Sequence, residues 1–195
     1  VDWISAGAWG VGLTLASSLA DKRAFTYSRD HLTGTRSNRL ISAGNALPWI
    51  GLAGAAVLAL DGSDPVRSRT AVAAAEAGSS GILLATGLKY LVGRARPDQG
   101  LGTTTFKPFT ATNYDSFPSR HAITAWAVAT PFAKQYDAPW LYGVAALSNL
   151  SRVAGQNHWV SDTVASAALG YGLGMLFWEV SAAPKRAGEP RVMVN

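Results

Sequence analysis

Cysteine is absent from this chain of 195 residues, which excludes both disulfides and thiolate zinc sites. Histidine is scarce as well. The three histidines form no H-x-x-x-H or H-E-x-x-H pattern, so we expect no metal site and no other cofactor. Charged residues make up only 15% of the chain and leave long stretches without any charge. These absences direct attention to uncharged helices and to the few charged residues between them.

The charge that is present has an excess of one sign. Lysine and arginine number 17 against 12 acidic residues, which gives a formal net charge of +5 and an isoelectric point near 9.7. An anionic partner is therefore expected, such as a phosphate compound, an acidic membrane surface or nucleic acid. Because no nucleic-acid motif is present, we expect a phosphorylated small molecule or lipid and no nucleic acid. The oligomeric state cannot be read from the sequence.

Six charge-free stretches rich in Ala, Leu and Gly predict six helices, because they lack the alternation of a half-buried strand. They cover residues 3–20, 40–60, 77–88, 122–133, 138–151 and 163–178. We therefore expect an all-α fold, a single-domain bundle of about six helices over residues 1–183, followed by a flexible tail at 184–195. A polar loop at 98–117 is long enough to indicate a functional role.

The sequence leaves open whether the helices cross a membrane. Only the first two charge-free stretches approach the ~20 residues that span a bilayer. The mean hydropathy of +0.12 is modest, although small residues also pack helices inside membranes. We favour a soluble or peripheral bundle slightly, with an integral membrane protein as the alternative. A start at Val1 without a charged and apolar leader suits an exported chain that has lost its signal segment.

The stretch "LKYLVGRARPD" contains a pair of cations. Lys89, Gly93 and Arg96 share one helical face if the helix continues to Pro97, with Gly93 clearing space between the two charges. The alternative interpretation is a solvated basic helix end favoured by the helix dipole.

The stretch "FPSRHAITAW" resembles the start of a helix. Ser119 is a candidate N-cap and His121 falls in the first turn, where free backbone N–H groups bind anions. An ordinary cap with an exposed histidine is the alternative.

The stretch "SRVAGQNHWVSD" carries the strongest signal. His158 and Asp162 can meet across one helical turn, and a carboxylate on one ring nitrogen leaves the other free as nucleophile or base. Arg152 can clamp an anion in bidentate fashion. If His158 attacked phosphorus, it would need cations, N–H donors and an acid, and the two preceding stretches would supply them.

These three stretches together, "KYLVGRARP", "PSRH" and "SRVAGQNHWVSD", resemble the ordered motifs of the type 2 phosphatidic acid phosphatase superfamily. That superfamily includes lipid phosphate phosphatases, bacterial non-specific acid phosphatases and vanadium haloperoxidases. The resemblance covers residues 89–162 and implies an all-helical domain with its active site at one end of the bundle.

The resemblance implies a role for each matching residue. His158 would be the nucleophile that forms a phosphohistidine, Asp162 would orient it, and His121 would protonate the leaving group. Phosphate would be bound by the remaining residues: Lys89, Arg96, Ser119 with its hydroxyl and N–H, and Arg152. No metal is needed for this chemistry.

One position departs from the family pattern, since Arg120 stands where the second motif usually has glycine. Arginine tolerates positive φ poorly, so either the backbone is ordinary there or Arg120 is strained. The guanidinium could bind a second phosphate, or it could point into solvent or pair with an acidic residue.

The sequence therefore predicts a metal-independent phosphatase for phosphomonoesters or pyrophosphates, with lipid-linked ones among the candidates. The alternatives are a vanadate-dependent haloperoxidase and a non-catalytic anion-binding envelope protein. By resemblance we expect a bacterial cell envelope location. The protein would be periplasmic and soluble or peripheral, or else integral to the inner membrane with its active site facing the periplasm.

Overall fold

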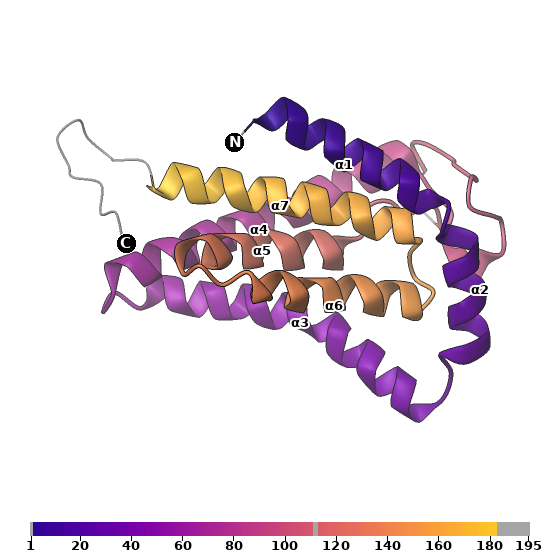
Figure 1. Ribbon diagram of the computed structural model, residues 1–195, viewed down its shortest axis with the longest axis horizontal. Helices are drawn as coiled ribbons and strands as arrows, with labels where there is room; N and C mark the ends of the chain where they lie inside the picture. The colour runs from indigo at the N-terminus through magenta and orange to yellow at the C-terminus, as the bar shows by residue number, and fades with distance from the viewer. Residues whose placement is uncertain (1, 111–112, 183–195) are drawn as a thin grey trace.

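The computed structural model describes residues 2–110 and 113–182, and its regular structure is helical. Within this part of the chain there is no strand, and a single isolated bridge pairs Arg94 with Phe106. The α-helices, labelled in Figure 1, are α1 (Trp3–Ser18), α2 (Asp21–His31), α3 (Thr35–Leu60), α4 (Pro65–Val92), α5 (Arg120–Gln135), α6 (Trp140–Ala154) and α7 (Val160–Ala182).

The predicted all-α single domain is confirmed, with one helix more than the six charge-free stretches among the described residues. The additional helix is α2, whose sequence DKRAFTYSRDH is too highly charged to appear among those stretches. A single 3₁₀ turn, η1 (Pro97–Gln99), lies in the long loop between α4 and α5. The tail predicted at 184–195 lies outside the described residues.

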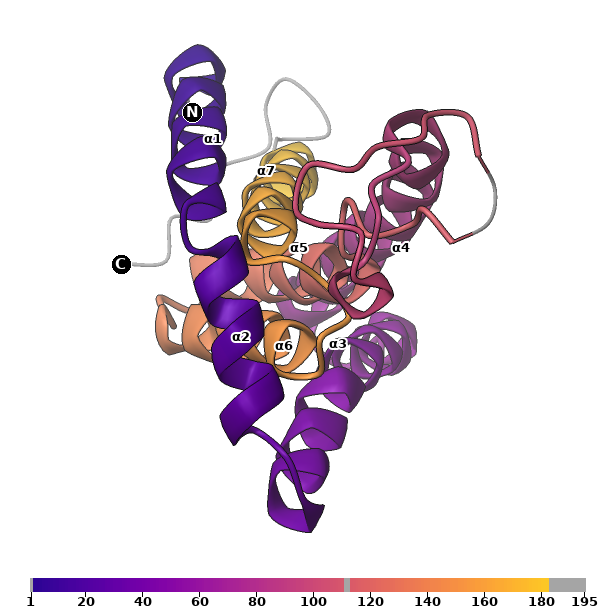
Figure 2. The ribbon, with the colours of Figure 1, turned by 90° about the vertical axis from the view of Figure 1, so that its right-hand side faces the viewer.

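Helix α5 is central, because it packs against α3, α4, α6 and α7. These five helices run along the long axis of the molecule, while α1 lies against α7 and α2 crosses one end of the bundle (Figure 1). The view onto that end shows α2 and the α4–α5 loop on either side of the ends of the core helices (Figure 2).

The cap residues explain where α4 begins and ends. The Asp64 carboxylate accepts from the N–H groups of Val66 and Arg67, and Pro65 occupies the first position of the helix. At the other end, Gly93 adopts the left-handed conformation with φ 58° and closes the helix. A Cβ at Gly93 would overlap the carbonyl oxygen of Lys107.

The condition for a shared helical face, that this helix continues to Pro97, is therefore not met, because α4 ends at Val92. Gly93 is required by the turn and by the loop packed against it, and it does not clear space between two cations on one helical face. Arg96 lies beyond the turn in extended backbone.

Small residues bring the core helices close together. The fully buried side chains of α4 and α5 include many alanines: Ala71, Ala73, Ala74, Ala77, Ala85, Ala122 and Ala127. On α7, a Cβ at Gly174 would lie 2.5 Å from the Cβ of Thr130 on α5, which is too close for any side chain. Helices in membranes commonly pack through such small residues.

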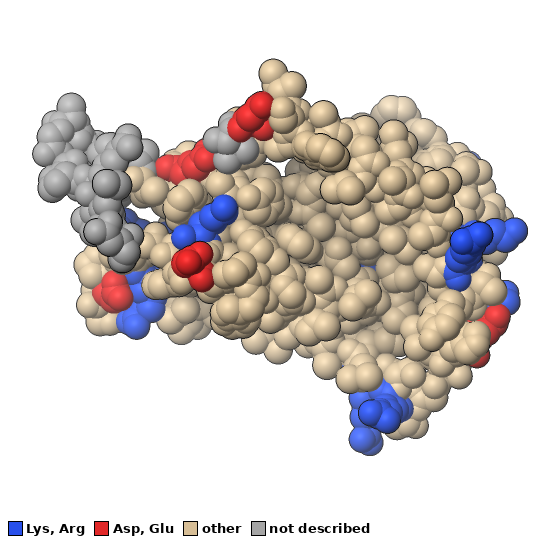
Figure 3. All heavy atoms as spheres, viewed as in Figure 1, with Lys and Arg blue, Asp and Glu red and all other residues tan. Residues whose placement is uncertain are grey.

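Three of the described helices are long and apolar enough to cross a membrane, namely α3, α4 and α7. The sequence prediction chose 3–20 and 40–60. The first of these two stretches corresponds to α1, which has only 16 residues. Helices α4 and α7, in contrast, extend well beyond their charge-free stretches and so reach membrane-spanning length. On the face shown in Figure 3, charged side chains gather toward the two ends and leave a wide uncharged band between them. These features support the integral membrane alternative.

Candidate active site

Four helix ends meet at the end of the bundle that α2 crosses. They are the C-terminal ends of α4 and α6 and the N-terminal ends of α5 and α7 (Figure 1). Every candidate residue lies on one of these ends or directly beside it: Lys89, Arg96, Ser119, Arg120, His121, Arg152, His158 and Asp162. The fold thus brings candidate residues from positions as far apart as 89 and 162 to a single end of the bundle.

His158 is buried, with 3% of its surface exposed. Burial, together with the positive charges of Lys89 and Arg152, lowers its pKa to about 4, although Asp162 acts in the opposite direction. The imidazole is therefore neutral at pH 7, as a nucleophile requires. Lys89 of α4 and Arg152 of α6 therefore lie close enough to His158 for their charges to act on its ring.

Asp162 is fully buried and accepts from several donors. Its Oδ1 accepts from Arg94 Nη1 at 2.6 Å. Its Oδ2 accepts from Ser116 Oγ at 2.5 Å and from the backbone N–H of Trp159 at 3.0 Å. The His158 Nδ1 lies 3.7 Å from Oδ2, beyond hydrogen-bond distance, and has no other partner among the described residues.

The two side chains meet as predicted, but not across a helical turn. His158 precedes α7, which begins at Val160, so the backbone turn before the helix sets its position. The sequence pattern also missed Arg94 and Ser116, the two side-chain donors to Asp162. Arg94 stands two residues before Arg96 in the first motif, which is the only signal that could have identified it.

His121 lies in the first turn of α5, and its ring makes a T-shaped contact with the Trp49 ring from α3 at a centroid distance of 5.1 Å. Burial, together with the charges of Arg152, His158 and Arg120, lowers the pKa of His121 to about 4. A bound phosphoryl dianion would supply negative charge and raise this pKa toward the range where His121 can act as an acid.

Ser119 caps α5 as predicted, because its Oγ accepts from the Ala122 N–H at 3.4 Å. Its own N–H is not available for phosphate, since it donates to Ser166 Oγ at 2.8 Å. The first two residues of α5, Arg120 and His121, have no intrahelical acceptor for their N–H groups. These two N–H groups therefore have no helical partner at the α5 end.

Arg96 forms a bidentate pair with Asp115, through Nε and Nη2 at 2.7 Å each. The backbone carbonyl of Asp115 also accepts from Lys89 Nζ. The Arg96 side chain thereby lowers the pKa of the Asp115 carboxyl below its usual range. Asp115, which the sequence analysis did not identify, connects both cations of the first motif to the long loop.

Arg152 is buried, and its Nη1 donates to the Asn45 side chain of α3 at 3.1 Å. Its Nε has no partner among the described residues, so a buried donor remains for an anion. Burial, together with the charges of Arg96 and Arg120, lowers the pKa of Arg152 to about 10, and the side chain stays positively charged at pH 7.

Arg120 is exposed and occupies the first position of α5. Among the described residues, the non-glycine positions with positive φ are Phe109, Asn113, Asp137 and Gln156, so Arg120 has ordinary backbone geometry. The strain considered from its replacement of glycine is therefore absent. Within the same described part of the chain, no cluster of three His, Asp or Glu residues could hold a metal ion.

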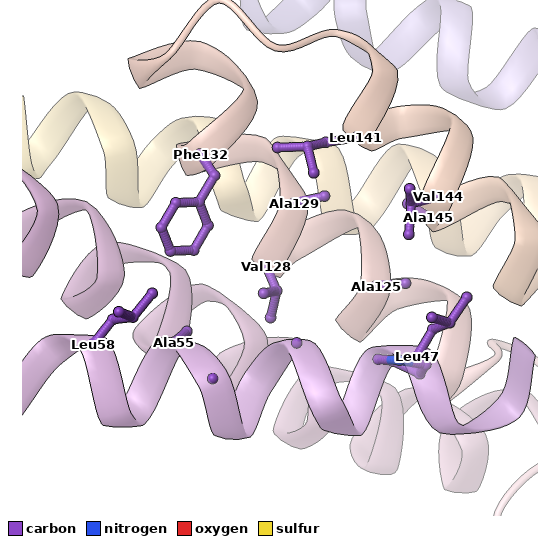
Figure 4. Close-up of a pocket in the computed structure, with 13 residues that line it drawn as sticks. Leu47, Ala55, Leu58, Ala125, Val128, Ala129, Phe132, Leu141, Val144 and Ala145 are labelled. Carbon is purple, nitrogen blue, oxygen red and sulfur yellow. The ribbon is translucent and has the colours of Figure 1, made fainter. Parts of the chain in front are cut away.

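An apolar groove runs between α3, α5 and α6, with a volume of about 240 Å³ (Figure 4). On α3 it begins with Leu47, two residues after the Asn45 that binds Arg152, and on α5 it begins with Ala125, one turn after His121. Further along, Leu58, Val128 and Phe132 line it. The groove thus leads from the polar end into the apolar part of the bundle.

Comparisons with known proteins bear on the fold and the family of this chain. A solved structure titled as a transmembrane PAP2 type phosphatidylglycerolphosphate phosphatase from Bacillus subtilis has a TM-score of 0.63 and 19% sequence identity, covering 94% of this chain and 98% of that one. At that identity the likeness shows the fold alone.

Two curated relatives are named lipid A 1-phosphatase. The one from Porphyromonas gingivalis is 38% identical over 99 residues, which cover 48% of this chain and 20% of the relative. The one from Rhizobium johnstonii is 36% identical over 96 residues, which cover 45% of this chain and 38% of the relative. The match thus spans well under half the length of either relative.

The family model of the PAP2 superfamily matches residues 70–186. This segment contains all three motifs and extends from the first buried turns of α4 through α7. The predicted resemblance is confirmed: the chain belongs to the PAP2 superfamily.

Proposed function

We propose that this protein is a metal-independent phosphatase that removes phosphate from a lipid-linked phosphomonoester or pyrophosphate through a phosphohistidine at His158. The observation that carries the proposal is a buried, neutral His158 with Asp162 behind it and the cations of α4 and α6 around it. The relatives named lipid A 1-phosphatase support a phosphorylated lipid as the substrate class.

In the first step, Nε2 of His158 attacks the phosphorus atom while the bond to the leaving oxygen breaks. His121 donates a proton to that oxygen, and the developing positive charge on the His158 ring is stabilised by Asp162 at Nδ1. In the second step, His121 accepts a proton from water, which attacks the phosphohistidine and releases inorganic phosphate with His158 neutral again.

The negative charge on the phosphoryl oxygens must be stabilised in the transition state, and hydrogen-bond donors that are already in place provide this stabilisation. Arg152 offers its free Nε, and the N-terminal end of α5 offers backbone N–H groups. The bidentate pair with Asp115 uses Nε and Nη2 of Arg96 and leaves Nη1 for the substrate. Asp115 therefore orients this arginine while the phosphate binds beside it.

The apolar groove supports a lipid-linked substrate. An acyl chain that lies in the groove would place its phosphorylated head at the end where His121 and Trp49 meet. The three long apolar helices would keep this groove within a bilayer, so that the substrate enters without leaving the membrane. We place the protein in the inner membrane with its active site facing the periplasm.

The test is phosphate release by protein purified in detergent, with EDTA present throughout. The panel contains p-nitrophenyl phosphate, phosphatidic acid, isoprenyl pyrophosphate and lipid A. His158→Ala should lose more than about 10³-fold in kcat, as expected for removal of a nucleophile. His31→Ala is the matched control, because His31 is exposed on α2 and stacks on Tyr27.

Quenching with alkaline detergent during turnover of a ³²P-labelled substrate should trap label on wild type and not on His158→Ala, because the P–N bond of phosphohistidine is stable in alkali and hydrolyses in acid. Hydrolysis that survives in His158→Ala would contradict the proposal, as would activity lost in EDTA and restored by zinc or magnesium. Bromide oxidation with peroxide and vanadate would indicate the haloperoxidase alternative. Phosphate binding without hydrolysis of any substrate would indicate the anion-binding protein.

A further inference from the structure

Arg94 is a buried cation that the proposed reaction does not use. Its Nη1 donates to Asp162 Oδ1 at 2.6 Å, and its Nη2 donates to Asp21 Oδ2 at 2.8 Å. Only 8% of the Arg94 side chain is exposed, and both carboxylates are fully buried. One positive charge therefore lies between two negative charges, one from α7 and one from α2.

The guanidinium has no donor left for a substrate. Besides the two acids, Nη1 donates to Ser161 Oγ at 2.8 Å, and Nε and Nη2 donate to the Thr103 carbonyl at 3.1 and 2.7 Å. Five hydrogen bonds thus occupy the five N–H groups of Arg94. The rings of Phe106 and Trp159 each lie 5.6 Å from its central carbon. A side chain held in this way has one orientation.

Asp21 is equally fixed. Its Oδ1 accepts from the Ser161 N–H at 2.9 Å and its Oδ2 from the Ser161 Oγ at 2.7 Å. The contact fastens α2 to the start of α7. Asp21 lies outside the segment that the family model matches, which begins at residue 70.

The charges in this cluster have a consequence for His158. If Arg94 paired with Asp162 alone, the pair would be neutral and would attract a positive imidazole weakly. Because Asp21 offsets the charge of Arg94, the three groups together keep one negative charge, and Asp162 is the member that faces His158. In a buried site this difference is large.

Building on the proposed function, we propose that Arg94 and Asp21 form a positioning pair for catalysis. Arg94 fixes the Asp162 carboxylate toward Nδ1 of His158, and Asp21 offsets the charge of Arg94 so that Asp162 can stabilise the cationic ring of the phosphohistidine. Neither residue touches the substrate. The segment that carries Asp21 is thereby part of the catalytic unit although it precedes the matched family segment.

Other charged groups also act on His158 and must stay unchanged in the test. Those that face it from the surrounding elements are Lys89 of α4, His121 of α5, Arg152 of α6, Asp115 of the long loop and Asp162 of α7. The variants below alter none of them.

The test compares Asp21→Asn, Arg94→Met and the double variant with wild type, using Asp30→Asn as the control. Asp30 lies on the same helix as Asp21 but is exposed and paired with Arg29. The measurement is the pH profile of kcat/KM on the best substrate of the panel, whose acid limb reports protonation of His158. The unfolding midpoint is measured in parallel.

We expect Asp21→Asn to move the acid limb to lower pH and Arg94→Met to move it to higher pH, because they remove charges of opposite sign. The double variant removes a neutral pair, so its limb should return to the wild-type position. In all three, kcat should fall by about tenfold or more with little change in KM, as for carboxylates that support a functional histidine.

Shifts in the same direction, or profiles like that of Asp30→Asn, would overturn the positioning pair while leaving the proposed function intact. If the single variants do not fold, the double variant decides: an unchanged kcat, or failure to fold, would overturn the proposal. Absence of hydrolysis by wild type would overturn the proposed function and this inference with it.

Discussion

The low pKa of His121 predicts that kcat/KM is highest in acid. The proposed acid must be protonated in the free enzyme, yet burial and neighbouring positive charges lower the pKa of His121 to about 4. At pH 7 only about one free molecule in 10³ then carries the proton. Above pH 4, kcat/KM should therefore fall by about tenfold per pH unit.

His158 must at the same time be neutral, and its pKa is also about 4. The profile of kcat/KM is therefore a narrow bell, and at its maximum only about a quarter of the free enzyme has both groups in the required state. Bound phosphate raises the pKa of His121, so the basic limb of kcat should lie at higher pH than that of kcat/KM.

The exposed Arg120 provides the perturbation, since its charge contributes to the low pKa of His121. Arg120→Gln should move the basic limb of kcat/KM to higher pH by roughly 0.2–0.7 pH unit. This shift corresponds to the interaction energy of roughly 0.2–1 kcal/mol that is typical of exposed charge pairs. Lys134→Gln, in the last turn of the same helix, is the control. A flat kcat/KM between pH 5 and 8, or a limb that moves to lower pH, would refute the reasoning.

Three further predictions concern stability. Gly93→Ala should lower the free energy of unfolding by about 1–3 kcal/mol or more, because φ is 58° and the new Cβ overlaps a loop carbonyl; chemical denaturation measures this. Gly174→Ala should lower the unfolding midpoint clearly more than Gly172→Ala on the same helix, since the first Cβ would lie 2.5 Å from a carbon of α5 and the second 3.8 Å from its nearest neighbour. Buried His158 binds its proton less readily when folded and should account for about 3 kcal/mol of the stability that wild type loses between pH 6.5 and pH 4; His158→Ala should remove this share and leave the share of His121, whose pKa is lowered in the same direction.

The sequence predicted the helical class because charge-free stretches and cap residues are local signals. It missed α2 because that helix is stabilised by buried contacts of Asp21 and Ser28 rather than by an apolar stretch. It left open a continuation of α4 to Pro97 because the preference of Gly93 for the left-handed conformation becomes decisive only when the loop packs against it.

For the candidate site, the sequence predicted which residues come together but not their contacts. The motif spacing named the residues that the fold brings to one end, including His158 and His121, without fixing the distances between them. The contacts of Arg94 and Asp115 depend on a loop that folds back over α4, and no local pattern encodes such contacts.

The packing of α4, α5 and α7 through glycine and alanine has a consequence for how this protein can diversify. A frame in which backbones nearly touch cannot accept larger side chains, so mutations there are eliminated whatever the substrate. Variation is left to the lining of the groove on α3 and α6 and to the exposed rim of the α4–α5 loop. New substrate specificities should therefore arise by exchange of residues at these two surfaces, around a helical frame that stays the same.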